Sequence, residues 1–227
     1  MTAAAKGTDP PRIVFVDTET TGLDVERHQL WEIALIIRDR SAQLDDVEHR
    51  YYLQPDLSRA DSAALQIGRF YQRTEGLRRA TVDYDDGVVN TAGLSWSSDR
   101  WRWSMPMAVA GEVARITAGA VLIGSNVQFD ARMLSYWLRA HSQAPAWHYR
   151  PVDVGAIALG YLRGIHDAAP AGSDAERNAR PDWLLPWSTG MLASVLGVTC
   201  PPDARHTALG DARFVRDLYD KTTGGTR

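Results

Sequence analysis

Cysteine is nearly absent from this 227-residue sequence, and Cys200 is the only one. A single cysteine excludes a disulfide bond within the chain, which suits the reducing cytoplasm. No apolar run approaches the roughly 20 residues that a membrane-spanning helix requires. Residues 1–7 also lack the apolar core of a secretory signal. We therefore expect a cytoplasmic protein that does not associate with membranes.

Lysine is also scarce, since only Lys6 and Lys221 are present and both lie near the chain ends. The internal positive charge is therefore almost entirely arginine, which suits bidentate phosphate contacts, although a compositional bias of the source genome explains it equally well. The formal net charge of -3 argues against a broad, non-specific grip on nucleic acid. It does not exclude an enzyme that handles only a strand end.

The remaining composition, 44% hydrophobic and 23% charged, is that of an ordinary globular protein with one well-formed core. We expect a flexible leader at residues 1–10, a single domain at 11–220 and a flexible tail at 221–227. Two segments inside that domain lack clear periodicity: a Trp-rich excursion at 76–105 and a Pro-rich loop at 166–186. The tryptophans of the first, Trp96, Trp101 and Trp103, are expected to pack on the core.

Hydrophobic periodicity predicts strands first and then helices that alternate with a further strand. The predicted strands are 13–16, 30–37, 49–53 and 120–124. The predicted helices are 61–68, 107–117, 126–140, 153–162, 189–196 and 207–219. The first three strands suggest an antiparallel meander, and the later alternation adds parallel strands. We therefore expect an α/β fold with a mixed β-sheet flanked by helices.

Two carboxylates stand at the end of the first predicted strand. Side chains alternate between the faces of a strand, so Phe15, Asp17 and Glu19 share one face, while Val14 and Val16 point the other way. At that separation like charges repel, and either one takes up a proton or a cation lies between them. A strand that simply runs out into an acidic turn is the alternative.

Two further carboxylates lie on helix faces where the pattern calls for apolar groups. Asp130 is four residues before Leu134, and Asp211 is four residues before Val215, so each points inward with its apolar neighbours. An unpaired buried carboxylate costs several kcal/mol. A structural arginine could neutralise one such acid, but a shared metal site accounts for all four more economically.

Oxygen ligands without histidine or cysteine select magnesium or manganese rather than zinc. Two such ions about 4 Å apart would clamp the attacking and leaving oxygens of a phosphodiester. His206 lies five residues before Asp211, on the loop that enters the last helix, and is the candidate general base. Five other histidines lack comparable acidic neighbours and are expected to be surface or packing residues: His28, His49, His141, His148 and His166.

With these residues assembled, the chain resembles the DnaQ-like exonucleases of the DEDDh group, which have a ribonuclease H-like fold. The first motif of that group appears as Val16-Asp17-Thr18-Glu19-Thr20-Thr21-Gly22-Leu23. The second is similar to Gly124-Ser125-Asn126-Val127-Gln128-Phe129-Asp130. The third is similar to His206-Thr207-Ala208-Leu209-Gly210-Asp211, where histidine marks the subgroup. Trp31-Glu32-Ile33 and Asp153-Val154 also match, and the resemblance covers residues 12–220.

The resemblance implies a ribonuclease H-like mixed sheet and a metal-dependent 3′-5′ exonuclease that releases nucleoside 5′-monophosphates. It implies that two magnesium or manganese ions are bound by four carboxylates, namely Asp17, Glu19, Asp130 and Asp211. It further implies that His206 activates the attacking water. Thr18, Thr20 and Leu23 are expected to approach the 3′-terminal nucleotide, and Asn126 is expected to support the site. The segments 76–105 and 166–186 depart from the family pattern.

Several readings of the function remain open. The favoured one is a DNA exonuclease that acts alone or with a polymerase or repair complex, as in proofreading. An RNA-trimming exonuclease of the ribonuclease T or oligoribonuclease kind is the second. A non-catalytic module that binds nucleic acid ends is the third, although such a protein would usually have lost an acid or the histidine. A haloacid dehalogenase-type phosphohydrolase is rejected, because it would need aspartate at Glu19 and an internal lysine.

Overall fold

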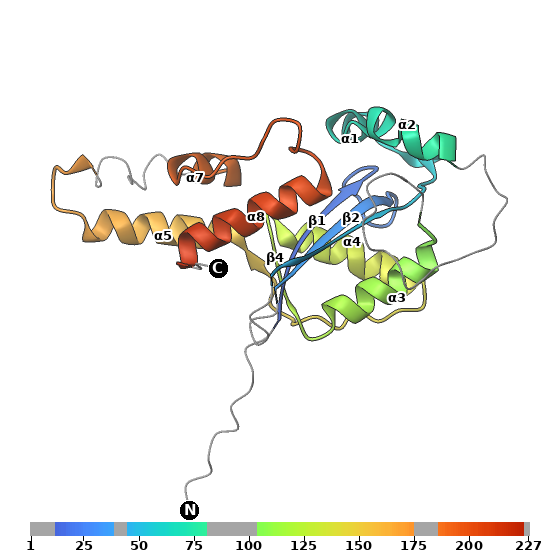
Figure 1. The fold of residues 1–227 in the computed structure, drawn as a ribbon, viewed down its shortest axis with the longest axis horizontal. Helices are drawn as coiled ribbons and strands as arrows, with labels where there is room; N and C mark the ends of the chain where they lie inside the picture. The colour runs from blue at the N-terminus through green and yellow to red at the C-terminus, as the bar shows by residue number, and fades with distance from the viewer. Residues whose placement is uncertain (1–11, 39–44, 81–103, 175–185, 225–227) are drawn as a thin grey trace, which may run out of the picture.

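The structure is a computed structural model that describes residues 12–38, 45–80, 104–174 and 186–224, without the side chains of 76–80. Its centre is a five-stranded sheet in the order β3-β2-β1-β4-β5 (Figure 1). The strand bounds are β1 Ile13–Thr20, β2 Leu30–Arg38, β3 Val47–Tyr52, β4 Val121–Gly124 and β5 Val152–Asp153. The central strand is thus the one that carries Asp17 and Glu19.

The sheet is mixed, as predicted. β1 pairs antiparallel with β2, and β2 pairs antiparallel with β3, which makes the expected meander. On its other side β1 pairs in parallel with β4, and β4 with β5. The two-residue strand β5 was not predicted from the sequence, because a strand this short leaves no alternation to detect.

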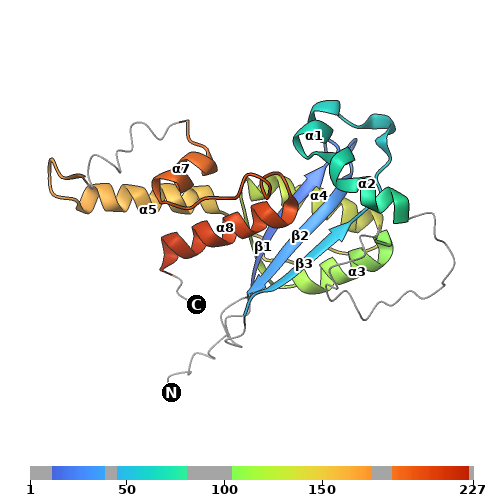
Figure 2. The ribbon, with the colours of Figure 1, turned by 45° about the horizontal axis from the view of Figure 1, so that its top comes forward.

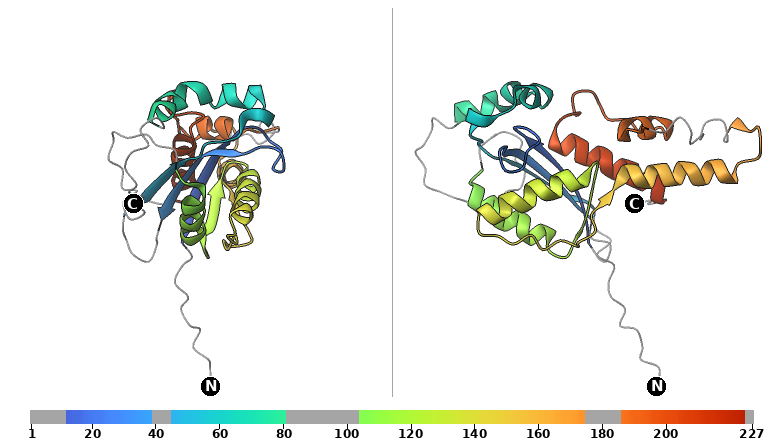
Figure 3. Two further views of the ribbon diagram at one scale, coloured as in Figure 1. Left: turned by 90° about the vertical axis from the view of Figure 1, so that its right-hand side faces the viewer. Right: turned by 180° about the vertical axis from the view of Figure 1, so that it is seen from behind.

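Helices cover both faces of the sheet and one end of its strands (Figures 1 and 2). On one side lie α3, Pro106–Thr117, and α4, Val127–Ala140. On the other lie α5, Val154–Ala168, α7, Thr189–Val195, and α8, Ala208–Thr223. A 3-10 turn at Leu57–Arg59 leads to α1, Ser62–Ile67, and α2, Phe70–Ala80, which lie over the end of the sheet (Figure 3).

The alternation along β1 divides the core in two. Val14 and Val16 face the cluster under α3 and α4, which includes Leu122, Leu134 and other buried residues. Ile13 and Phe15 face the cluster under α5, α7 and α8. A smaller cluster of Trp31, Tyr52, Leu65 and Phe70 fixes α1 and α2 to the sheet. Asp17 and Glu19 therefore continue the row that α8 covers.

Two helices are longer than predicted, and a third, α2, was not predicted. α5 continues to Ala168, so residues 166–168 of the predicted Pro-rich loop are helical, and α8 continues to Thr223, so residues 221–223 of the predicted flexible tail are helical as well. α2 was not predicted as a helix at all, and its last five residues, 76–80, were assigned to the irregular excursion, where Gly76 weakens the helical signal. The rest of that excursion at 81–103, including its tryptophans, lies outside the described residues, as do 175–185 of the Pro-rich loop.

Among the described residues, every helix is too short or too polar to span a membrane.

The first prediction concerns the core beneath the second motif. Leu134 of α4 is fully buried, so Leu134→Ala should lower the free energy of unfolding by about 2–5 kcal/mol. Met107 of α3 is 71% exposed, and Met107→Ala should change it by less than about 0.5 kcal/mol. Urea unfolding followed by circular dichroism measures both. Equal effects of the two substitutions would contradict the packing described for α4.

Candidate metal and catalytic site

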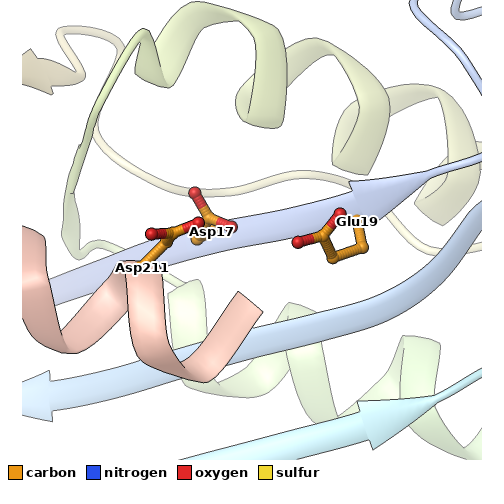
Figure 4. Close-up of side chains that lie close together, drawn as sticks. All are labelled: Asp17, Glu19 and Asp211. Carbon is orange, nitrogen blue, oxygen red and sulfur yellow. The ribbon is translucent and has the colours of Figure 1, made fainter. Parts of the chain in front are cut away.

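Three carboxylates from two elements meet at the end of β1. Asp17 and Glu19 lie on the β1 face that α8 covers, and Asp211 projects from the first turn of α8 (Figure 4). One oxygen from each lies within 4.8 Å of the others. This is the separation at which a single cation, or a pair of cations, can be shared. The sequence predicted a group of four acids, and three of them, without Asp130, form this cluster.

Local sequence around the third motif fixes where Asp211 stands. Thr207 caps α8, since its Oγ1 accepts a hydrogen bond of 3.0 Å from the backbone N–H of Gly210 and donates one of 2.7 Å to the carbonyl of Ala204. A Cβ added at Gly210 would lie 2.0 Å from that carbonyl oxygen. Glycine at this position therefore lets the preceding loop pack directly on the first helical turn.

Burial and mutual repulsion raise the pKa of these acids. The pKa of Asp17 stands well above its ordinary value, first because of burial and then because of the charges of Asp130, Asp211 and Glu19. Burial and the charge of Glu32 raise the pKa of Glu19 to about 8, against the opposing effect of Arg73. In the absence of a cation, this site therefore holds protons near neutral pH.

Asp130 stands beside the other three rather than among them. It lies in the first turn of α4 and is almost fully buried, and its Oδ1 accepts a hydrogen bond of 2.7 Å from the Thr18 hydroxyl. Burial raises the pKa of Asp130 to about 7, and the Thr18 hydrogen bond partly offsets that rise. Because Thr18 points to the opposite face of β1 from Asp17, Asp130 approaches the strand from the α4 side.

Asp211 has an unused oxygen. Its Oδ2 accepts a hydrogen bond of 3.0 Å from the backbone N–H of His206. Its Oδ1 is buried and accepts no hydrogen bond from any described residue, although Nη1 of Arg205 lies 3.1 Å away. Burial raises the pKa of Asp211, with Arg205 opposing the rise. This oxygen therefore has an ion-pair partner but no hydrogen bond, which leaves it able to bind a cation.

The donor set therefore fits a hard divalent cation. The ligand atoms offered by Asp17, Glu19 and Asp211 are all carboxylate oxygens, which suit magnesium and manganese. Their raised pKa values record the cost of keeping the acids charged without such an ion. Asp130 adds a fourth carboxylate on the far side of β1 from α8. The structure thus brings three of the four predicted ligands together, and the role of Asp130 stays a prediction.

His206, the predicted general base, lies on the loop before α8 and has an exposed side chain. Its backbone is in the left-handed region, with φ of 56°, which few residues other than glycine adopt without support. That support comes from both of its peptide groups. The N–H donates to Asp211, and the carbonyl accepts a hydrogen bond of 2.8 Å from Arg73. The imidazole is therefore presented to solvent from an anchored backbone.

The residues predicted to touch substrate fall into two groups. The hydroxyls of Thr18 and Thr20 are engaged inside the protein, with Asp130 and with the carbonyl of Gly22 respectively. Leu23, by contrast, is 77% exposed at the tip of the turn after β1. Asn126 is exposed and left-handed, with φ of 55°, and its N–H donates to Asp153. Leu23 and Asn126 are accessible to a ligand, whereas the two threonines present only their backbone.

Sequence reasoning did not assign a role to three residues that border the site. Glu32 is fully buried and pairs with Arg50 and Arg73. Arg73 also lies 3.9 Å from Glu19, and Arg69 binds the loop that carries His206. A single acid within the apolar strand 30–37 was a signal that Glu32 has partners. No sequence spacing indicates the two arginines, because they reach the loop across 133 to 136 residues.

Comparison with known proteins gives relatives in sequence and in structure. No family model matches the chain. The oligoribonuclease of Azoarcus sp. strain BH72 is 28% identical over 159 residues, which cover 66% of this chain and 74% of that protein. The oligoribonuclease of Leifsonia xyli subsp. xyli is 29% identical over 150 residues, which cover 66% of this chain and 65% of that protein.

Among solved structures, the zinc-bound Escherichia coli exonuclease I in complex with single-stranded DNA matches with a TM-score of 0.59 and 15% identity. The same enzyme with a dT13 oligonucleotide matches with a TM-score of 0.55 and 14% identity. These matches cover 93% and 94% of this chain, which spans 40% and 41% of the exonuclease I chains. Together with the mixed sheet, they show that this chain has the ribonuclease H-like fold of the DnaQ-like 3′-5′ exonucleases.

Proposed function

We propose that this protein is a metal-dependent 3′-5′ exonuclease that hydrolyses the terminal phosphodiester bond of a nucleic acid strand and releases nucleoside 5′-monophosphates. The observation that carries the proposal is the meeting of Asp17, Glu19 and Asp211 within 4.8 Å, on a strand and a helix far apart in sequence. The names of the relatives in sequence and structure support the same reaction class.

The carboxylates Asp17, Glu19, Asp130 and Asp211 would hold two divalent cations, with magnesium or manganese as the expected ions. When bound, such ions neutralise charge on the phosphate and lower the pKa of water. The described carboxylates contribute by fixing the donor oxygens from rigid elements: Asp17 and Glu19 from a central strand, and Asp211 from a capped helix. Rigid placement of this kind avoids reorganisation during the reaction.

His206 would accept the proton of the attacking water. Its exposed imidazole stands at the end of an anchored loop whose N–H is bound to the ligand Asp211, so the base and the carboxylates are linked through one short segment. Histidine is the side chain that most often serves as a general base. Leu23, which is exposed beyond β1, would pack against the base of the 3′-terminal nucleotide. The backbone of Thr18 and Thr20 would approach the sugar of the same nucleotide. Asn126 would support the site.

RNA is a second candidate substrate class beside DNA. The sequence relatives at 28–29% identity are named oligoribonucleases, whereas the exonuclease I structures at 14–15% identity hold DNA. The exonuclease I complexes contain single-stranded oligonucleotides, and we propose a single-stranded 3′ end as the ligand in both cases. Association with a polymerase or repair complex, and residence in the cytoplasm, stay predictions.

The first test uses 5′-labelled single-stranded DNA and RNA of one sequence, with free or blocked 3′ ends, in the presence of magnesium or manganese. A ladder that shortens from the free 3′ end should appear, and it should vanish with EDTA and in Asp17→Ala, because that variant loses a ligand. The faster substrate decides between DNA and RNA. Binding of oligonucleotide without any metal-dependent product would instead support a non-catalytic binding module.

A second test addresses the general base. His206→Ala should keep metal and substrate binding but lower kcat by roughly 100- to 10,000-fold, the usual contribution of a positioned base. His166→Ala is the matched control, because His166 lies on α5 and pairs with Asp167, and it should keep wild-type turnover. A loss below about tenfold in His206→Ala would count against the proposed role.

A third test uses the raised pKa values. Because the folded-state pKa values of Glu19, about 8, and Asp130, about 7, exceed their ordinary values, the folded protein binds protons that the unfolded chain releases. Their contribution to stability is therefore present below about pH 4 and is lost as the pH rises through 7 to 8. The metal-free Tm should accordingly fall over this interval, and less steeply in Asp17→Asn, which removes one of the repelling charges.

Metal should reverse this loss. Manganese at 100 times its Kd at pH 8 should stabilise the folded protein by about 2.7 kcal/mol at that pH. The same concentration should raise the Tm less at pH 5, because the ligands must be deprotonated. Differential scanning fluorimetry with and without manganese measures both quantities. A rise in Tm that is the same in wild type and Asp17→Asn would place the ion elsewhere.

A further inference from the structure

The loop that carries His206 is held by two arginines from the other end of the site. Arg69 stands just before α2, and its Nη2 donates hydrogen bonds of 2.8 Å to the carbonyls of both Asp203 and Arg205. One turn later, Nη1 of Arg73 donates a hydrogen bond of 2.8 Å to the carbonyl of His206. Three of the four carbonyls at positions 203–206 are therefore bound by arginine side chains.

The guanidinium of Arg73 is itself fixed on several sides. Its Nη1 also donates a 3.0 Å hydrogen bond to the carbonyl of Gly68, its Nη2 pairs with Glu32, and its Cζ lies 4.6 Å from the centre of the Trp31 ring. Only 11% of the side chain is exposed. A group constrained by a ring, a carboxylate and a carbonyl has one available orientation, so the carbonyl of His206 is held in place.

Glu32 links this arrangement to the helix that carries Asp211. Its carboxylate is fully buried and accepts a hydrogen bond of 3.2 Å from the backbone N–H of Ala208, the first residue of α8, while it also pairs with Arg73. A negative charge at a helix N-terminus is favourable. The same carboxylate thus contacts the arginine that binds His206 and the helix that presents Asp211.

Both peptide groups of His206 are anchored in this way, the N–H by Asp211 and the carbonyl by Arg73. A left-handed histidine persists only when its surroundings enforce the conformation. The carbonyls of Asp203 and Arg205 lie in a solvent-accessible loop, where water could satisfy them. The loop carbonyls therefore do not need the arginines, 133 to 136 residues away, as hydrogen-bond donors. The arginine contacts instead determine the shape of the loop.

We propose that Arg69 and Arg73 are positioning residues, which hold the backbone of His206 so that its imidazole is directed at the attacking water. The inference rests on the proposed role of His206 as general base. Neither arginine contributes a proton or a metal ligand. Their removal leaves the carboxylates of Asp17 and Asp211 on their own elements, but it allows the loop to relax from the left-handed conformation and the imidazole to turn away.

A double-mutant cycle with His206→Ala tests the proposal. Arg69→Met removes hydrogen bonds to two loop carbonyls without touching a carboxylate, and Arg73→Lys keeps a positive charge beside Glu32 but cannot reach all three partners. Each should lower kcat by roughly 10- to 100-fold, the cost of a small misplacement of a reacting group, with KM near that of wild type. Arg213→Met is the control, because Arg213 lies on α8 and binds Glu48 instead.

The decisive comparison is made in the His206→Ala background, with long incubations to measure the residual turnover. If the arginines act through the imidazole, Arg69→Met should cause no further loss there, within about twofold. An equal loss in both backgrounds, or no loss of kcat in Arg69→Met, would overturn the proposal. If His206→Ala turned over at the wild-type rate, the proposed role of His206 as general base would be wrong. That result is distinct from the results that would overturn only the positioning role of the arginines.

Discussion

Repulsion between carboxylates at the end of β1 is the constraint on which the arrangement of this protein depends. Asp17, Glu19 and Asp211 are held close together, burial raises the pKa of each, and the charges of neighbouring carboxylates raise the pKa of Asp17 and Glu19 further. Two packed layers impose this proximity, because α8 covers the face of β1 that presents both strand acids. The surrounding arginines offset only part of the charge, so the site favours a cation.

The arginines around the site pair with different carboxylates. Arg205 stands by Asp211, and Arg73 stands between Glu32 and Glu19. Glu32 is the direct cross-strand neighbour of Glu19 in the sheet, which would be unfavourable without cations. Two arginines, Arg50 and Arg73, neutralise Glu32 and leave Glu19 with the more distant contact. Glu32, with two close arginine partners, is thus a structural carboxylate, whereas Glu19, with one more distant arginine, is left as a prospective metal ligand.

Much of the sheet and the positions of the acids followed from the sequence, because they rest on local periodicity. Alternation along 13–19 predicted that Val14 and Val16 face one core while Asp17 and Glu19 face another, and the two clusters confirm the division. Helix α2 and the contacts of Arg69 and Arg73 were not predicted. They depend on how α2 meets a loop more than 130 residues away, and no periodicity encodes such a meeting.

The placement of Asp17 near the beginning and Asp211 near the end has a consequence for how the protein matures. During synthesis the strand acids emerge first, and they lack their partner until α8 docks against β1 and β2. Pairing of such distant segments is a slow, late event in folding. The cluster of three carboxylates therefore exists only after the last helix has been made and has docked on the sheet.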